Sequence, residues 1–288
     1  MRRPLFLTAA VAGIASPAFA RESGSALWTS WFGDPLVETL IAILMALYLT
    51  GLVTMLSSRH PKWAVSKPRV LAFFAAVLAL VLALLSPVDA LSEELFSVHM
   101  FQHLLLILAV APLLAYSNSH LVILRAFPIS TRRYIGQAIA AFPGMKQAAH
   151  KEVAAWIAAG FFVVTMWFWH IPAAYDWALG NEAVHVCEHV TLLVAATFFW
   201  RVVLTSGKRR LSPAMAVVLV SLVGIQGSFL SALIMFAPHP LYAAYSGNGL
   251  DDQVLAGVLM CIPASFVYLG STIWALSRML GNSRTHVR

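Results

Sequence analysis

Seven stretches of this chain are almost continuously apolar, and polar segments separate them. Each approaches the roughly 20 residues that an α-helix needs to cross a bilayer. We predict membrane-spanning helices at Leu36–Leu56, Val70–Ser86, Phe96–Ala115, Val153–Trp169, His185–Leu204, Ala214–Phe236 and Val254–Ser277. The pattern therefore predicts an all-α integral membrane protein, a seven-transmembrane-helix bundle that forms one polytopic domain over residues 21–288.

The composition agrees with this class. Of 288 residues, 60% are hydrophobic and only 11% are charged, whereas a soluble domain carries about 25% charged residues. The longest connection, Tyr116–Lys151, contains the apolar run Leu121–Leu124, which predicts a short helix at the membrane surface. An ordinary soluble protein is excluded.

The first 20 residues have the pattern of a signal peptide. Arg2 and Arg3 precede an apolar run, and Ala18-Phe19-Ala20 resembles a signal-peptidase site. Cleavage there would start the mature chain at Arg21, outside a bacterial cytoplasmic membrane. The alternative is a retained short anchor. In either case the next span enters the membrane from outside.

The charged residues alternate between loops. The formal net charge is +7, and lysines and arginines mark cytoplasmic loops. On one side lie Arg59, Lys62, Lys67, Arg69, Arg125, Arg132, Arg133, Lys146, Lys151, Lys208, Arg209, Arg210, Arg278, Arg284 and Arg288. On the other lie Asp89, Glu93, Glu94, Asp176, Glu182, Asp251 and Asp252. This predicts an N-terminus outside, a C-terminus inside, and contact with membrane lipid rather than nucleic acid.

Five histidines are predicted at the outer ends of the spans. His99 and His103 are spaced i,i+4 on one helix, and His185 and His189 repeat this spacing on another. Such residues share a helix face. His170 ends a third span on the same side. Polar side chains at membrane depth usually serve a function, and imidazole binds copper, zinc, iron and nickel. We predict a metal or haem site here.

Further residues nearby are candidates for supporting these ligands: Met100, Asp176, Glu188, Asp252 and Gln253. Of these, Met100 and Glu188 lie off the shared faces of the two histidine pairs. Met100, Met235 and Met260 are expected mainly to pack. Cys187 lies between His185 and His189 but points away, which leaves a transient contact with metal open. Cys187 and Cys261 have no CxxC spacing, so neither a disulfide framework nor a zinc finger is predicted.

Several functions use membrane histidines. A di-iron desaturase is disfavoured because the chain has no HxxHH box and its pairs face outward. A b-type cytochrome remains open, with His103 and His189 as axial ligands. A metal-handling assembly protein, or a metal-free scaffold, also remains open. No nucleophile triad or phosphate loop is present, so we predict a protein that is not an enzyme.

The motifs themselves resemble those of the multi-span CtaG family, cytochrome c oxidase assembly factors of the Bacillus type. The similar segments are His99-Met100-Phe101-Gln102-His103 with Ala111-Pro112, Trp169-His170-Ile171-Pro172 with Tyr175-Asp176, His185 with Glu188-His189 and Phe199-Trp200, and Asp252-Gln253 with Gly257 and Met260. Leu113 and Cys261 depart from the usual pattern, where proline and tryptophan are common.

The resemblance implies a factor that matures a haem–copper oxidase by supplying copper to its catalytic centre. His99, His103, His185 and His189 would then hold one copper ion on the periplasmic side, and His170 would complete or gate the site. The implied partners are the oxidase catalytic subunit and a periplasmic copper donor. The implied location is the bacterial cytoplasmic (inner) membrane.

Overall fold

The computed structural model describes residues 31, 34–57, 66–141, 151–204 and 211–285, and these contain helices and no strand. Six of the long elements are single helices: α4 (Pro35–Leu56), α5 (Lys67–Leu84), α12 (Lys151–Trp169), α14 (Glu182–Leu204), α15 (Pro213–Met235) and α16 (Gly249–Thr285). The other is a composite helix built from α7 (Phe96–Leu104), the π-helix η2 (Leu105–Val110) and α8 (Ala111–Ser117). In these ranges, seven helical segments are long and apolar enough to cross a membrane. The seven predicted spans are therefore confirmed.

Shorter helices connect the long ones. Two of them follow α8 in the long connection: α9 (Ser119–Ile123) and α10 (Ile129–Ala141). A 3-10 turn, η3 (Leu124–Ala126), lies between these two. At the opposite end of the molecule lie α6 (Pro87–Glu94), α13 (Pro172–Leu179) and the 3-10 helix η5 (Ala243–Asn248). The helix predicted around Leu121–Leu124 is thus confirmed. The predicted signal peptide lies outside the described residues.

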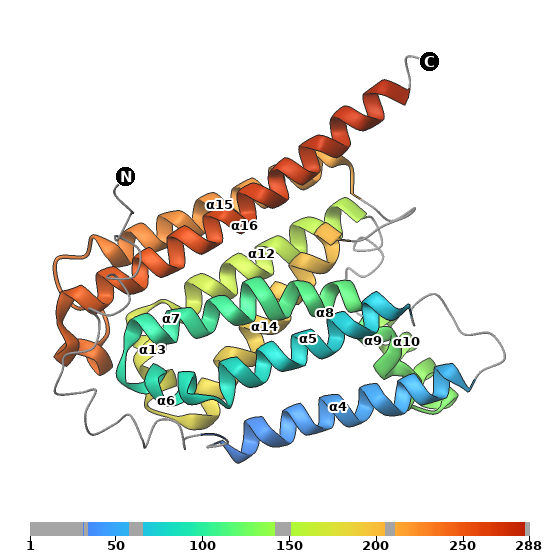
Figure 1. The fold of residues 1–288 in the computed structure, drawn as a ribbon, viewed down its shortest axis with the longest axis horizontal. Helices are drawn as coiled ribbons and strands as arrows, with labels where there is room; N and C mark the ends of the chain where they lie inside the picture. Colours follow the sequence, from blue (N-terminus) through green and yellow to red (C-terminus); the bar gives the residue numbers. More distant parts are fainter. Residues whose placement is uncertain (1–30, 32–33, 58–65, 142–150, 205–210, 286–288) are drawn as a thin grey trace, which may run out of the picture.

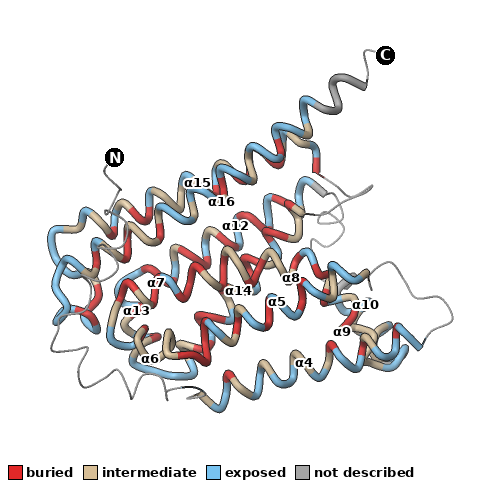
Figure 2. The backbone as a smooth tube through the Cα atoms, viewed as in Figure 1, coloured by how far each residue is buried: buried red, intermediate tan, exposed pale blue. Residues whose placement is uncertain are grey.

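The composite helix α7–η2–α8 and α14 run through the middle of the bundle, whereas α4 lies at one edge and α15 and α16 lie side by side at the other (Figure 1). Buried residues concentrate on the central helices, and the outer faces of α4, α15 and α16 are exposed (Figure 2). Those exposed faces carry large apolar side chains such as Val53 and Phe266, which suits contact with lipid. The most buried positions are therefore the inward faces of α7 and α14.

The π-helix η2 accommodates Pro112, which lies inside the third span. Proline has no N–H and disturbs the turn before it, and one wide turn is a common way to absorb such a defect. The i→i+5 bonding of a π-helix would pair the carbonyl of Ile107 with the missing N–H of Pro112. Trp200 Nε1 on α14 donates to this carbonyl instead, at 2.9 Å. The third span thus stays continuous directly after His103.

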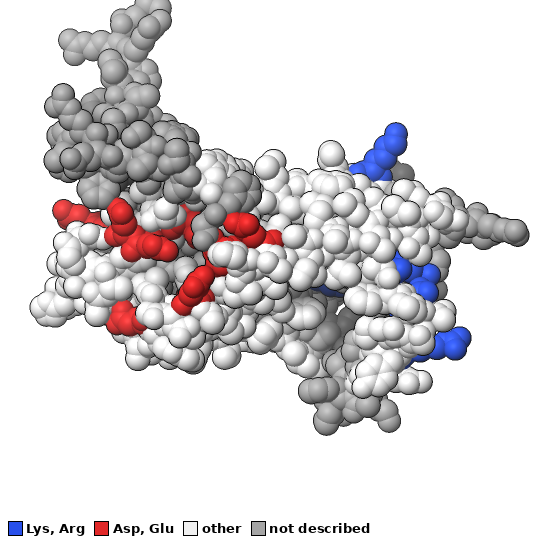
Figure 3. Space-filling view, turned by 90° about the horizontal axis from the view of Figure 1, so that it is seen from below, with Lys and Arg blue, Asp and Glu red and all other residues white. Residues whose placement is uncertain are grey.

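Charged side chains separate to opposite ends of the bundle. Aspartates and glutamates gather at the end that contains α6, α13 and η5, and described lysines and arginines lie toward the other end (Figure 3). This matches the predicted alternation of loops. Which end faces the periplasm stays a prediction.

Candidate metal centre

The two histidine pairs meet in the interior at the acidic end of the bundle. His99 and His103 project from α7, and their ring centroids are 4.4 Å apart. His185 and His189 project from α14, with centroids 4.3 Å apart. Across the helix interface, the centroids of His99 and His185 and those of His103 and His189 are each 5.2 Å apart. We call these four residues the histidine cluster.

The cluster brings nitrogen atoms within reach of one ion. Ring nitrogens of His99, His103 and His189 all lie within 4.8 Å of one another, and all three residues are buried. Nε2 of His99 is 3.0 Å from Nε2 of His103. Two imidazole nitrogens bound to a tetrahedral ion at about 2.0 Å would be about 3.3 Å apart. A small shift of either ring therefore gives a metal-binding geometry.

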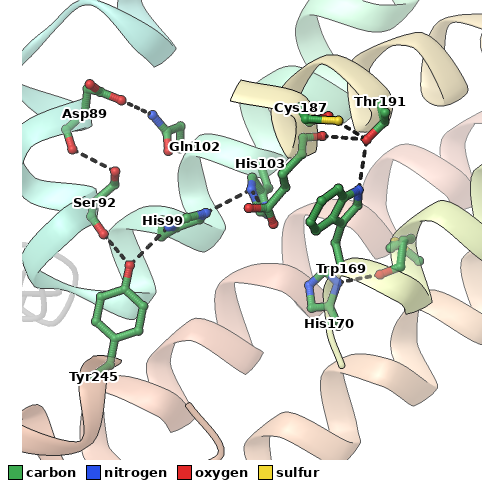
Figure 4. A network of polar contacts seen from close by, with 12 residues as sticks. Asp89, Ser92, His99, Gln102, His103, Trp169, His170, Cys187, Thr191 and Tyr245 are labelled. Carbon is green, nitrogen blue, oxygen red and sulfur yellow. Dashed lines mark hydrogen bonds and ion pairs between the residues drawn. The ribbon is translucent and has the colours of Figure 1, made fainter. Parts of the chain in front are cut away.

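A hydrogen-bond chain sets the tautomer of His99 (Figure 4). The Tyr245 hydroxyl donates to the backbone carbonyl of Ser92 at 2.5 Å. It must therefore accept the contact with His99 Nδ1, at 3.1 Å, so Nδ1 carries the proton. Nε2 of His99 then carries a lone pair directed at His103, whose Nε2 lies 3.0 Å away. Fixing the remote ring nitrogen in this way is typical of metal-binding histidines.

Several nitrogen and oxygen atoms in and beside the cluster have no hydrogen-bond partner among the described residues: His103 Nδ1, His185 Nε2, His189 Nε2 and both carboxylate oxygens of Glu188. Buried polar atoms are normally paired, so this concentration of unpaired nitrogen and oxygen atoms at one place points to a ligand.

Glu188 lies closer to the cluster than we predicted from its spacing in the sequence. It was predicted off the shared face of the His185/His189 pair, as a residue that only orients a neighbour. Its Oε1 lies 3.5 Å from His103 Nε2, and its carboxylate forms a second group of potential ligands with His99 and His185. The signal was available, because His185 and Glu188 are spaced i,i+3 and so lie on neighbouring positions of one helix face.

His170 lies beside the cluster rather than in it. Its ring centroid is 6.3 Å from that of His103. Its Nδ1 donates to the carbonyl of Met166 at 2.7 Å, and its buried Nε2 has no partner among the described residues. Burial lowers the pKa of His170 to about 4, against the opposing effect of the Met166 bond. It is a neutral imidazole with a free lone pair.

Three of the predicted supporting residues hold the framework of the site and do not touch the cluster. Asp252 accepts hydrogen bonds from the first amides of α7, at Phe96 and Ser97. Gln253 accepts from Leu241 and Asp176 from Ala243 and Ala244. Together they position α7 and the segment that carries Tyr245.

Met100 and Cys187 occupy different surroundings. Met100 is buried beside the cluster and lines a small cavity together with His103 and His170. Cys187 is an exposed free thiol and is absent from the groups of close donor atoms found in the described ranges. The expectation that Cys187 points away agrees with this placement.

A cavity connects the cluster with the acidic end. It has a volume of about 240 Å³ and is lined by Asp34, Asp89, Glu93, Glu182, His185 and His189, among others. We call it the acidic vestibule. Gln102, in the motif of the third span, donates to Asp89 at 2.7 Å and so ties α6 to α7. Burial is the largest cause that raises the pKa of Asp89, to about 6.

Sequence reasoning did not find Tyr245, Ser92 or Met166. Tyr245 is 146 positions from His99 in the chain, and it reaches the site only because η5 folds over the end of α7. Neither spacing nor residue type distinguishes it from the other tyrosines.

Comparisons with known proteins agree with the motifs. The family described as cytochrome c oxidase caa3 assembly factor (Caa3_CtaG) matches residues 46–282. Comparison with curated proteins and with solved structures gave no match. The matched range includes the histidine cluster, His170 and the helices that hold them. Since it covers most of the chain, this protein belongs to the cytochrome c oxidase caa3 assembly factor family.

Proposed function

We propose that this assembly factor binds a copper ion in the histidine cluster and passes it to the catalytic centre of a cytochrome c oxidase. Copper is the cargo, and no catalytic turnover is required. The observation that carries the proposal is the convergence of ring nitrogens of His99, His103 and His189 from α7 and α14, with His185 and Glu188 beside them and several polar atoms unpaired.

The donor set suits copper. Neutral imidazole is the form that binds metal, and the contact with Tyr245 leaves the lone pair of His99 on Nε2, which faces His103. Imidazole-rich sites have higher affinity for copper than for most other first-row divalent ions. Because the family serves the assembly of a haem–copper oxidase, copper is also the ion that the partner needs.

The acidic vestibule supports a route for loading. Carboxylates lining a cavity attract cations and raise their local concentration. The vestibule contacts His185 and His189 directly, so a cation that enters it meets the cluster without crossing apolar protein. On the predicted topology this opening faces the periplasm, where a copper donor would dock.

The ring geometry disfavours haem. A porphyrin would have to lie between His103 and His189, its predicted axial ligands. Their ring centroids are 5.2 Å apart at an interplanar angle of 86°, and the ring of His99 occupies the neighbouring space, 4.4 Å and 5.8 Å from them. A macrocycle enters only if α7 and α14 separate, whereas a single ion needs no such opening.

The first experiment compares the protein with a His103→Ala/His189→Ala variant. Both are purified in detergent and measured for metal content and absorption, and oxidase activity per oxidase polypeptide is measured in cells. We expect about one equivalent of copper on the cluster of the wild type, no Soret band, a copper affinity lowered at least about 10-fold in the variant, and loss of oxidase activity with the oxidase polypeptide still made.

The control is His239→Ala, which removes an exposed histidine at the same end of the bundle. It should behave like the wild type. A Soret band that disappears in the double variant would replace copper by haem. Normal oxidase maturation in the double variant would contradict the delivery role, and an absence of metal in the wild type would leave a scaffold.

A further inference from the structure

A second cavity next to the histidine cluster, which we call the methionine cavity, has an apolar lining that includes three methionines. It has a volume of about 30 Å³ and lies where α7, η2, α12, α15 and α16 meet. Three methionines from three different helices line it, Met100, Met166 and Met260, and so do His103 and His170. Met100 had been expected only to pack or to support the ligands, and Met260 only to pack.

The nitrogen atoms at this cavity have free lone pairs. His170 Nδ1 donates to the carbonyl of Met166, which leaves Nε2 as an acceptor, and Nε2 has no partner among the described residues. His103 Nδ1 also has no hydrogen-bond partner among the described residues. His170 is 7% exposed, so water does not readily satisfy it, and an unpaired buried acceptor costs about 1–3 kcal/mol. A bound ligand would remove that cost.

Ordinary packing explains this arrangement less well. Flexible methionines usually fill gaps in a core, yet here they surround a space that stays open. The site for a side chain at Gly227 is also vacant, 3.8 Å from the terminal methyl of Met166. The volume is large enough for one ion or one water molecule. A water molecule would find mostly apolar side chains around it, and the thioethers among them are weak hydrogen-bond acceptors.

We propose that this cavity is a second metal site, which takes Cu(I) through the Met100, Met166 and Met260 sulfurs and His170 Nε2. Soft thioether ligands select Cu(I) over Zn²⁺ and over harder divalent ions. An apolar site that water does not enter also favours the lower charge of Cu(I). His170 therefore belongs to this site rather than completing the histidine cluster.

The position of the site gives it a place in copper transfer. His189 lines the acidic vestibule, and His103 lines the methionine cavity, so the histidine cluster lies between the two. Cu(I) leaving the cluster would exchange imidazole for thioether ligands, with no electron transferred and no proton required. In this respect the inference rests on the proposed function, but the binding site itself stands or falls separately.

The test uses the full-length protein in detergent with Cu(I) or Ag(I) as the probe, since Ag(I) shares the softness of Cu(I) and is not readily oxidised. The variant is Met166→Leu/Met260→Leu, which conserves volume. The control is Met215→Leu, a methionine of α15 that packs on the core outside this cavity. Bound metal is counted after gel filtration, and X-ray absorption distinguishes sulfur from nitrogen ligands.

We expect two Cu(I) ions per chain in the wild type and the control, with sulfur scattering, and one ion with nitrogen scattering alone in the Met166→Leu/Met260→Leu variant. His185→Ala/His189→Ala, which leaves the methionine cavity intact, should keep the sulfur-bound ion. Unchanged metal content and sulfur scattering in the methionine variant would overturn the second site. A wild type that binds the sulfur-bound ion but no nitrogen-bound ion would instead overturn the proposed function.

Discussion

At the scale of single residues, tautomers and unpaired lone pairs define the chemistry of this protein. His99 and His170 both carry their lone pair on Nε2, but different partners hold their Nδ1 atoms. A tyrosine hydroxyl holds His99, whereas a backbone carbonyl holds His170. Only the first can be removed by substitution, so Tyr245 is the residue through which the cluster can be tested without changing a ligand.

Replacing Tyr245 by phenylalanine should weaken copper binding. The change removes the acceptor for His99 Nδ1–H and leaves that buried N–H unpaired. We expect copper affinity to fall about 10- to 100-fold, as is usual for partners of ligating histidines, with a stability loss of about 1–3 kcal/mol. Competition with a chromophoric chelator measures the affinity.

The matched control is Tyr48→Phe, because the Tyr48 hydroxyl is buried on α4 without a hydrogen-bond partner among the described residues. It should leave copper affinity unchanged. Equal affinities for Tyr245→Phe and wild type would show that the hydroxyl does not orient His99.

At the scale of elements, the site depends on helices that pack closely and in one register. The π-helix η2 lies between the cluster and Pro112 and keeps the third span continuous. On the far side of the methionine cavity, α15 and α16 approach closely at Gly257. A Cβ built there would lie 2.8 Å from Met235 Cβ and 3.0 Å from the Ser231 carbonyl.

We therefore expect Gly257→Ala to push α15 and α16 apart and to destabilise the protein by about 1–3 kcal/mol. The neighbours that would clash are backbone and Cβ atoms, which cannot rotate away. A fluorescence-detected thermal midpoint in detergent measures the loss. At Gly270, further along the same helix, a Cβ meets nothing within 4 Å, so Gly270→Ala should keep the midpoint or raise it. An equal midpoint for both variants would contradict the close packing.

At the scale of the whole molecule, the charges divide the bundle into an acidic and a basic end (Figure 3), and the acidic vestibule opens at the acidic end. Asp89 is the lining carboxyl group whose pKa is clearly shifted. Burial raises its pKa to about 6, the hydrogen bond from Gln102 opposes the rise, and the negative charges of Glu93 and Asp34 add to it. Glu182 and His185 face the same cavity.

The sign of the pH effect follows from this raised pKa. The folded protein holds the Asp89 proton more tightly than the unfolded chain does, so the stability contributed by this group is full below the unfolded pKa, near 3.8, and is lost as pH rises through about 6. Cation capture changes in the opposite direction, because Asp89 is a carboxylate only above about pH 6.

We expect the association rate of copper to rise several-fold as pH increases through about 6, and this step to shrink in Asp89→Asn. Stopped-flow measurements at constant ionic strength test it, and Asp251→Asn, an acidic-end residue outside the vestibule lining, serves as the control. The same rise in Asp89→Asn as in wild type would assign the pH dependence to the histidines instead.

Much of this protein was predictable from local sequence. Helix length, hydropathy and alternating charge follow from the cost of placing polar groups in hydrocarbon, and this cost acts on each span separately. That is why the seven spans and the two charged ends were recognised. The i,i+4 spacing likewise placed His99 with His103 and His185 with His189 before any tertiary contact was known.

Tertiary packing decided which residues meet across helices. Tyr245 reaches His99, Glu188 turns inward toward His103, and His170 lines a cavity together with His103 and three methionines. None of these contacts has a sequence period, because each depends on the rotation and depth of one helix against another. The sequence by itself therefore determined the membrane bundle and the histidine pairs, whereas only the tertiary structure decided which ring nitrogens of the two pairs face one another and which residues hold them in place.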